Sequence, residues 1–67
     1  MTRDFDGRIV AVTGAAHGIG RAIALEFARG GADLAILDLD AAALEQTADA
    51  ARAHGGRVLA LPGDLLD

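Results

Sequence analysis

Three short apolar runs alternate along the chain with two stretches whose apolar residues recur at helical spacing. The runs at residues 8–12, 34–37 and 57–61 show no alternation of apolar with polar positions, which is typical of strands buried in a parallel sheet. Residues 19–29 and 41–54 fit helices, and a pair of glycines follows each of them. The pattern therefore predicts the order βαβαβ.

Each predicted helix has an apolar stripe. The stripe of the first helix consists of Ile19, Ala22, Ile23 and Phe27, and Arg21 lies off it and is expected to be solvated. The stripe of the second helix is thin and consists of Leu44, Ala48 and Ala51. Asp40 is a plausible N-cap of that second helix, and His54 is expected to act as a cation at its carboxyl end.

Right-handed crossovers place both helices on one face of a sheet ordered 3-2-1, an α/β arrangement of the Rossmann type. The strands are apolar on both sides, so about six side chains on the other face have nothing to pack against, which forgoes about 10–20 kcal/mol. A whole domain is stable by only about 5–15 kcal/mol. We therefore expect residues 1–67 to be the amino-terminal part of one longer, doubly wound domain, or to need a partner on that face.

Composition narrows the class of protein. The chain has 67 residues, a formal charge of −4 and a pI near 4.8, and its six arginines are scattered, which argues against a nucleic-acid surface. It has no cysteine, hence no disulfide or Cys-ligated metal site, and neither a secretory pattern nor a membrane-length apolar run. These features predict a cytoplasmic protein without metal ligands, and arginine without lysine, together with abundant alanine, hints at a bacterial genome rich in G and C.

Glycines dominate the junction between the first strand and the first helix. Gly14, Gly18 and Gly20 allow a sharp turn and leave the backbone N–H groups of the helix start accessible. A helix amino terminus favours an anion, so the pyrophosphate of a dinucleotide fits this junction. The spacing is Gly-x-x-x-Gly-x-Gly and differs from the usual Gly-x-Gly-x-x-Gly fingerprint.

The stretch Thr-Gly-x-x-x-Gly-Ile-Gly closely resembles the cofactor motif of the short-chain dehydrogenase/reductase family. The resemblance covers the whole chain and extends to Gly30-Gly31-Ala32, to Asp38 after the second strand, and to Gly63-Asp64-Leu65 after the third. It implies an oxidoreductase that transfers hydride between NAD and an alcohol or ketone, with a homo-oligomeric full-length form. These residues would then belong to an NAD(P)-binding Rossmann domain.

Asp38 is the residue that predicts NAD as the cofactor. It follows Gly20 by 18 residues, close to the interval at which an acidic side chain accepts hydrogen bonds from the adenosine ribose. The extra phosphate of NADP, about 4 Å from that carboxylate at an effective dielectric near 20, would be repelled by about 4 kcal/mol before screening. NADP is therefore the less favoured cofactor, although His17 occupies a position where NADP-preferring members of the family tend to carry a basic residue.

Further site residues follow from the resemblance by position only. The residue matching Asp64 reaches the adenine amino group, the backbone at Leu65 meets the ring, and the amide of Ile19 lies near the phosphates, whereas Thr13 is mainly structural. Members of the family catalyse with Tyr, Lys, Ser and Asn, none of which occurs in this sequence. We therefore assign no catalytic residue to this chain.

Other interpretations stay open at this point. The glycines can mark any tight turn, Asp38 can simply end a strand, the Pro-Gly-Asp at Asp64 can be an ordinary turn, and His17 can be a loop residue. The alternative function is a non-catalytic nucleotide-binding or interaction module, packed on a partner through its open sheet face. A methyltransferase that binds S-adenosylmethionine also combines glycines after strand one with an acid after strand two, but the glycine spacing counts against it.

Overall fold

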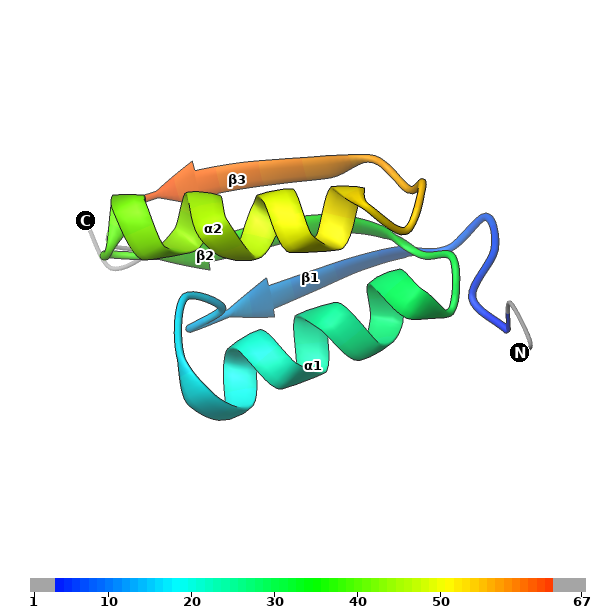
Figure 1. The fold of residues 1–67 in the computed structure, drawn as a ribbon, viewed down its shortest axis with the longest axis horizontal. Helices are drawn as coiled ribbons and strands as arrows, with labels where there is room; N and C mark the ends of the chain where they lie inside the picture. Colours follow the sequence, from blue (N-terminus) through cyan, green and yellow to red (C-terminus); the bar gives the residue numbers. More distant parts are fainter. Residues whose placement is uncertain (1–3, 64–67) are drawn as a thin grey trace.

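The computed structural model describes residues 4–63, which form three strands and two helices in the predicted order (Figure 1). Its elements are β1 (Ile9–Thr13), α1 (Gly18–Arg29), β2 (Asp33–Asp38), α2 (Ala41–Arg52) and β3 (Val58–Pro62). Element ends differ from the sequence prediction by at most two residues. Neither helix in this described range is long and apolar enough to cross a membrane.

The three strands form one parallel sheet in the order β1-β2-β3, which confirms the predicted 3-2-1 arrangement. In its register, Ala11 lies opposite Ala35, and Ala35 lies opposite Leu59. Helix α1 packs on β1 and β2, α2 packs on β2 and β3, and the helices contact each other. Both helices therefore cover the same face of the sheet, as Figure 1 shows.

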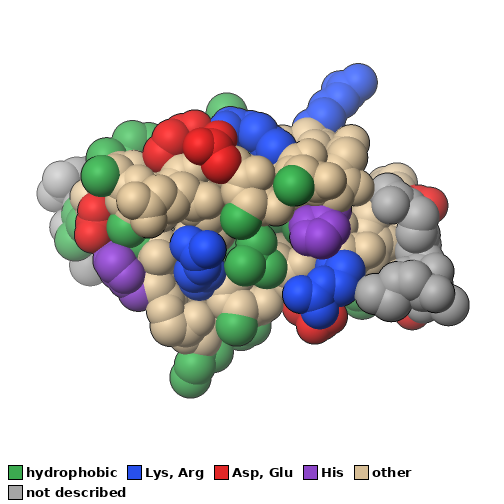
Figure 2. All heavy atoms as spheres, in the orientation of Figure 1, with side chains coloured by type: hydrophobic (Ala, Val, Ile, Leu, Met, Phe, Trp, Pro, Cys, Tyr) green, Lys and Arg blue, Asp and Glu red, His purple; other side chains and the backbone are tan. Residues whose placement is uncertain are grey.

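The core lies between that face and the helices. Its largest fully buried side chains are Ile36 from β2 and Leu44 and Thr47 from α2. The predicted stripe of α2 is confirmed, since Leu44, Ala48 and Ala51 are at most 1% exposed. On the outside of the helix layer, acidic and basic side chains are interspersed with apolar patches (Figure 2).

The predicted inward stripe of α1 is wrong at Ile19, Ala22 and Ile23, and only its last member, Phe27, is partly buried against the core. Ile19 is 80% exposed and Ile23 43% exposed, whereas Ala24 and Ala28 are buried, in line with Gly20 one turn before them. Small residues on this line let the helix axis approach the sheet, and a Cβ added at Gly20 would overlap the carbonyl oxygen of Gly14. Periodicity identified an apolar stripe, but close packing put the line of small residues inside.

The carboxyl end of α2 also differs from expectation. The helix ends at Arg52, so His54 lies beyond it, and the basic residue in the last turn is Arg52. The Arg52 guanidinium donates to the carbonyl of Val58 at the start of β3 (3.0 Å) and to Glu45 on its own helix (2.9 Å). Gly55 then turns the chain at a φ of +96°.

Within residues 4–63, the second face of the sheet carries no helix, and it is apolar and exposed, as expected. Ile9 is 81% exposed, Leu59 58% and Leu61 41%. Leu59 shares its row with Ala11 and Ala35, so apolar side chains cross all three strands. Contiguous exposed apolar surfaces of this kind commonly mark sites of contact with other protein segments.

Candidate functional site

The loop from β1 to α1 is built around glycines in left-handed backbone conformations. Gly14 has a φ of +67° and Gly18 a φ of +55°, values that residues with a Cβ rarely adopt. A Cβ at either position would meet nothing within 4 Å, so the space beside this loop is open. Gly20 serves a different purpose, because its missing Cβ lets α1 touch the backbone of Gly14. Together these glycines form a shallow cradle whose wall is bare backbone.

The amino terminus of α1 faces this cradle with its first backbone amides. The first hydrogen bond of the helix joins the amide of Arg21 to the carbonyl of His17 (3.3 Å). The amides of Gly18, Ile19 and Gly20 therefore precede the helix's own hydrogen-bond ladder. The first turn carries no acidic side chain, and His17, the N-cap residue, makes no side-chain cap hydrogen bond. The positive end of the helix dipole thus remains available to an anion such as phosphate.

Asp38, the last residue of β2, holds the loop to the neighbouring strand. Its Oδ2 accepts a hydrogen bond from the amide of Ala16 (3.0 Å), and its Oδ1 accepts one from the amide of Asp40 (3.1 Å). These two backbone donors lower the pKa of the Asp38 carboxyl below its ordinary value. Each carboxylate oxygen keeps a second lone pair, so the group can still accept hydrogen bonds from a ligand's hydroxyls.

Asp40 links the start of α2 to the same loop. One oxygen accepts from the amide of Ala43 (3.1 Å), which confirms the predicted N-cap. The other oxygen lies 2.9 Å from Nε2 of His17. The hydrogen bonds from His17 and Ala43 lower the pKa of Asp40. The His17–Asp40 contact was not predicted, because the two residues are far apart in sequence and only the pairing of β1 with β2 brings them together.

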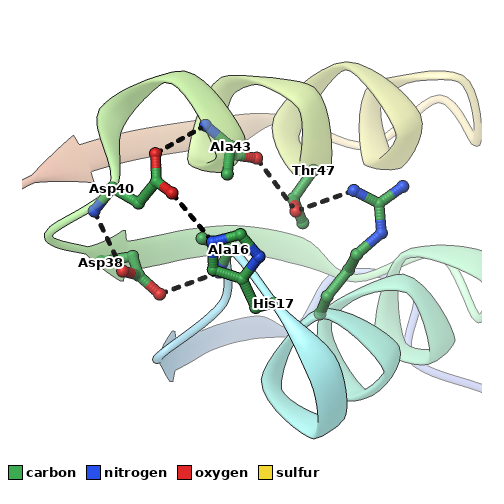
Figure 3. Close-up of polar contacts among 7 residues, drawn as sticks. Ala16, His17, Asp38, Asp40, Ala43 and Thr47 are labelled. Atoms are coloured by element: carbon green, nitrogen blue, oxygen red, sulfur yellow. Dashed lines mark hydrogen bonds and ion pairs between the residues drawn. The ribbon is translucent and has the colours of Figure 1, made fainter.

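A second connection joins the two helices further from the loop. Nη1 of Arg21 donates to Oγ1 of Thr47 (3.3 Å), and the Thr47 hydroxyl donates to the carbonyl of Ala43 (3.4 Å). Thr47 is fully buried. The expectation that Arg21 would be a solvated residue is therefore wrong, because its guanidinium bridges α1 to α2. Figure 3 shows both connections, with the side chains of His17 and Asp40 pointing toward each other.

The structure brings most of the candidate site residues to one end of the sheet. The carboxyl ends of β1 and β2 lie side by side, and the site there contains Gly14, His17, Gly18, Ile19, Gly20 and Asp38. Asp64 and Leu65 lie outside the described residues. The open cradle fits a pair of phosphates, and the Asp38 carboxylate fits a ribose diol, so the residues present suit a dinucleotide. The sequence offers no Tyr, Lys, Ser or Asn to act beside it.

Comparison with known proteins identifies a family. The family model for short chain dehydrogenase matches residues 8–67. A 1-deoxy-11-beta-hydroxypentalenate dehydrogenase of Streptomyces exfoliatus is 45% identical over 60 residues, covering 90% of this chain and 22% of its own length. A 2,3-dihydro-2,3-dihydroxybenzoate dehydrogenase of Bacillus subtilis is 37% identical over 65 residues, covering 97% of this chain and 25% of its own.

Solved structures agree with this result. A short chain dehydrogenase/reductase from Burkholderia phymatum, crystallised in complex with NAD, is 39% identical and superimposes with a TM-score of 0.86. The match covers 96% of this chain and 23% of that one. The chain therefore spans about a quarter of the length of these relatives.

Proposed function

The chain belongs to the short-chain dehydrogenase family, and on that premise we propose that residues 1–67 are the amino-terminal part of one NAD(P)-binding Rossmann domain. The whole protein is then an oxidoreductase that transfers hydride between NAD and a small alcohol or ketone. One observation carries this function: the carboxylate of Asp38 is fixed beside the glycine loop by Ala16 and Asp40, at the carboxyl ends of two parallel strands. Parallel α/β sheets bind dinucleotides at this end.

Different residues of the chain are proposed to bind different parts of the dinucleotide. The amides of Gly18, Ile19 and Gly20 receive the pyrophosphate, and Gly14 keeps side chains out of its way. Asp38 accepts hydrogen bonds from the hydroxyls of the adenosine ribose. Asp64 and Leu65, which lie beyond the described range, are proposed to contact the adenine. The bound nicotinamide supplies the hydride chemistry, which none of the side chains named above performs.

Preference for NAD over NADP follows from the charge on Asp38. Backbone donors keep its carboxyl ionised by lowering its pKa. A phosphate on the ribose hydroxyl that Asp38 receives would be repelled by about 4 kcal/mol at a separation of about 4 Å and an effective dielectric near 20. Solvent and salt reduce that repulsion, but half of it still discriminates by about 30-fold.

The remainder of the protein is proposed to complete the site. Because the sequence contains no Tyr, Lys, Ser or Asn, the residues that catalyse hydride transfer lie in other sequence of the full-length chain. That sequence also supplies the cover for Ile9, Leu59 and Leu61 on the open face. We propose a homo-oligomeric cytoplasmic protein with a small-molecule substrate and no nucleic-acid partner.

The proposal is tested on the full-length protein of the source gene. Its intact mass should far exceed the 6.8 kDa of these residues, and calorimetric titration should show NAD binding more tightly than NADP by at least about tenfold. Asp38→Asn is the matched variant, and it should reduce the NADP-to-NAD ratio of dissociation constants. A protein of 6.8 kDa that binds neither dinucleotide would contradict the proposal and favour the interaction module.

A further inference from the structure

The imidazole of His17 and the carboxylate of Asp40 meet beside Asp38. His17 directly follows Ala16, whose amide binds Oδ2 of Asp38, while Asp40 donates its own amide to Oδ1. The His17–Asp40 contact of 2.9 Å thus closes a ring around the carboxylate that is assigned to the ribose (Figure 3). Both members of the contact are thus tied, through the amides of Ala16 and Asp40, to the carboxylate at which a ribose phosphate would be repelled.

We propose that Asp40 is a positioning residue for cofactor selection, which engages His17 and so prevents the imidazole from attracting the 2′-phosphate of NADP. This inference rests on the proposed function and adds a second determinant to Asp38. Neither the cap role of Asp40 nor the loop position of His17 requires their contact, and His17 makes no side-chain cap hydrogen bond. The contact is therefore not explained by helix capping.

Donor and acceptor chemistry gives the mechanism. An ionised carboxylate only accepts hydrogen bonds, so Nε2 of His17 must carry the proton that points to Asp40. A neutral imidazole in this tautomer has a lone pair on Nδ1, and a lone pair cannot donate to a phosphate oxygen. A protonated imidazole keeps its charge, but Asp40 balances it. In either protonation state, NADP gains little from His17.

The charged groups that face His17 are mainly acidic. Asp38 and Asp40 face it from the end of β2 and the start of α2. Arg21 lies one turn further along α1 and directs its guanidinium to Thr47. Within residues 4–63, the nearby cation is thus engaged elsewhere.

The test measures dissociation constants of NAD and NADP for the full-length protein at pH 6 and pH 8. Asp40→Asn is the informative variant, because asparagine caps a helix as well as aspartate does and keeps the hydrogen bond from Ala43. Its amide can donate to Nε2, which moves the imidazole proton to Nδ1 and frees it for the phosphate. The variant should lower the NADP-to-NAD ratio of dissociation constants about three- to fivefold at pH 6, the size of an exposed ion pair.

The His17→Gln variant distinguishes an effect of Asp40 through His17 from a direct effect of Asp40 on the phosphate. The 2′-phosphate of NADP itself changes charge near pH 6, so the effect of Asp40→Asn is compared with its effect in the His17→Gln protein. We expect the change in ratio to shrink toward unity in that background. An equal change in both backgrounds would overturn the inference, because Asp40 would then act on the phosphate directly. An equal loss of affinity for both cofactors would also overturn it, because the effect would be structural. If the wild-type protein binds neither dinucleotide, the proposed function itself fails.

Discussion

Replacing Gly20 by alanine sets two physical effects against each other. In an exposed helix, alanine is more favourable than glycine by about 1 kcal/mol, so helix propensity alone predicts a more stable protein. In this structure the new methyl group would overlap the carbonyl oxygen of Gly14 and lie 2.7 Å from its carbonyl carbon and 3.3 Å from the amide nitrogen of Ala15. These are backbone atoms, which cannot rotate away.

Relief therefore requires a shift of about 1 Å between α1 and the loop. Overpacking of this kind costs about 1–3 kcal/mol, and a backbone contact belongs at the upper end of that range. After the propensity gain is subtracted, Gly20→Ala should lower the free energy of unfolding by about 2 kcal/mol. Misplacing the amides of Gly18 and Ile19 by about 1 Å should also weaken NAD binding, by about ten- to a hundredfold.

Both quantities are measured on the full-length protein, by urea unfolding and by calorimetric titration with NAD. Gly55→Ala is the matched control, because Gly55 has a φ of +96°, open space around its Cβ position, and a place far from the loop. It should lose about 1–2 kcal/mol of stability through backbone strain while keeping its NAD affinity. A Gly20→Ala protein that is as stable as wild type or more so, with unchanged NAD affinity, would refute the reasoning.

Three further variants of the full-length protein test other contacts. Asp38→Asn should flatten the loss of thermal stability in acid: since the folded-state pKa of Asp38 lies below its ordinary 3.8, its contribution is present above that value and is lost as the pH falls through the lower one. Thr47→Val should cost about 1 kcal/mol in urea unfolding by removing the acceptor of Arg21, and no change would contradict the bridge between the helices. Leu59→Asp should cost about 3 kcal/mol or more if other sequence covers the open face, against less than about 0.5 for the exposed loop control Leu39→Asp; equal losses would contradict that cover.

The order and direction of the elements could be predicted because their signals are local. Uninterrupted apolar runs indicated the parallel strands, and the handedness of crossovers then placed both helices on one face. The inward face of α1 could not be found in the same way, since Ile19 and Ile23 have larger apolar side chains than Ala24 and Ala28. What decided it was the close approach at Gly20, a tertiary contact that hydrophobic periodicity does not encode.

In the candidate site, too, local sequence signals could be predicted and tertiary contacts could not. The glycines and Asp38 have fixed sequence spacing and could be recognised, whereas the His17–Asp40 and Arg21–Thr47 contacts depend on side-chain directions across two elements. Asp40 illustrates the difference. Its cap hydrogen bond with Ala43 could be predicted from its position before the helix, whereas the contact of its second oxygen with His17 could not. The pairing of Thr13 with Leu37 places the loop after β1 beside the loop after β2, which brings His17 within reach of Asp40.

Asp38 has two roles, one proposed in binding the cofactor ribose and one in holding the β1–α1 loop, so a substitution there would affect both. Its carboxylate would accept the ribose hydroxyls, yet the same two oxygens hold Ala16 and Asp40 in place, and Ala15 continues the tie by donating to the carbonyl of Leu37 (3.2 Å). A neutral replacement at position 38 would therefore remove the repulsion of NADP and loosen the loop that is proposed to receive the phosphates of both cofactors. By contrast, the second oxygen of Asp40 contacts only the ring of His17 among the interactions described. We therefore expect substitutions at Asp40 to change cofactor preference while the β1–α1 loop keeps its support from Asp38.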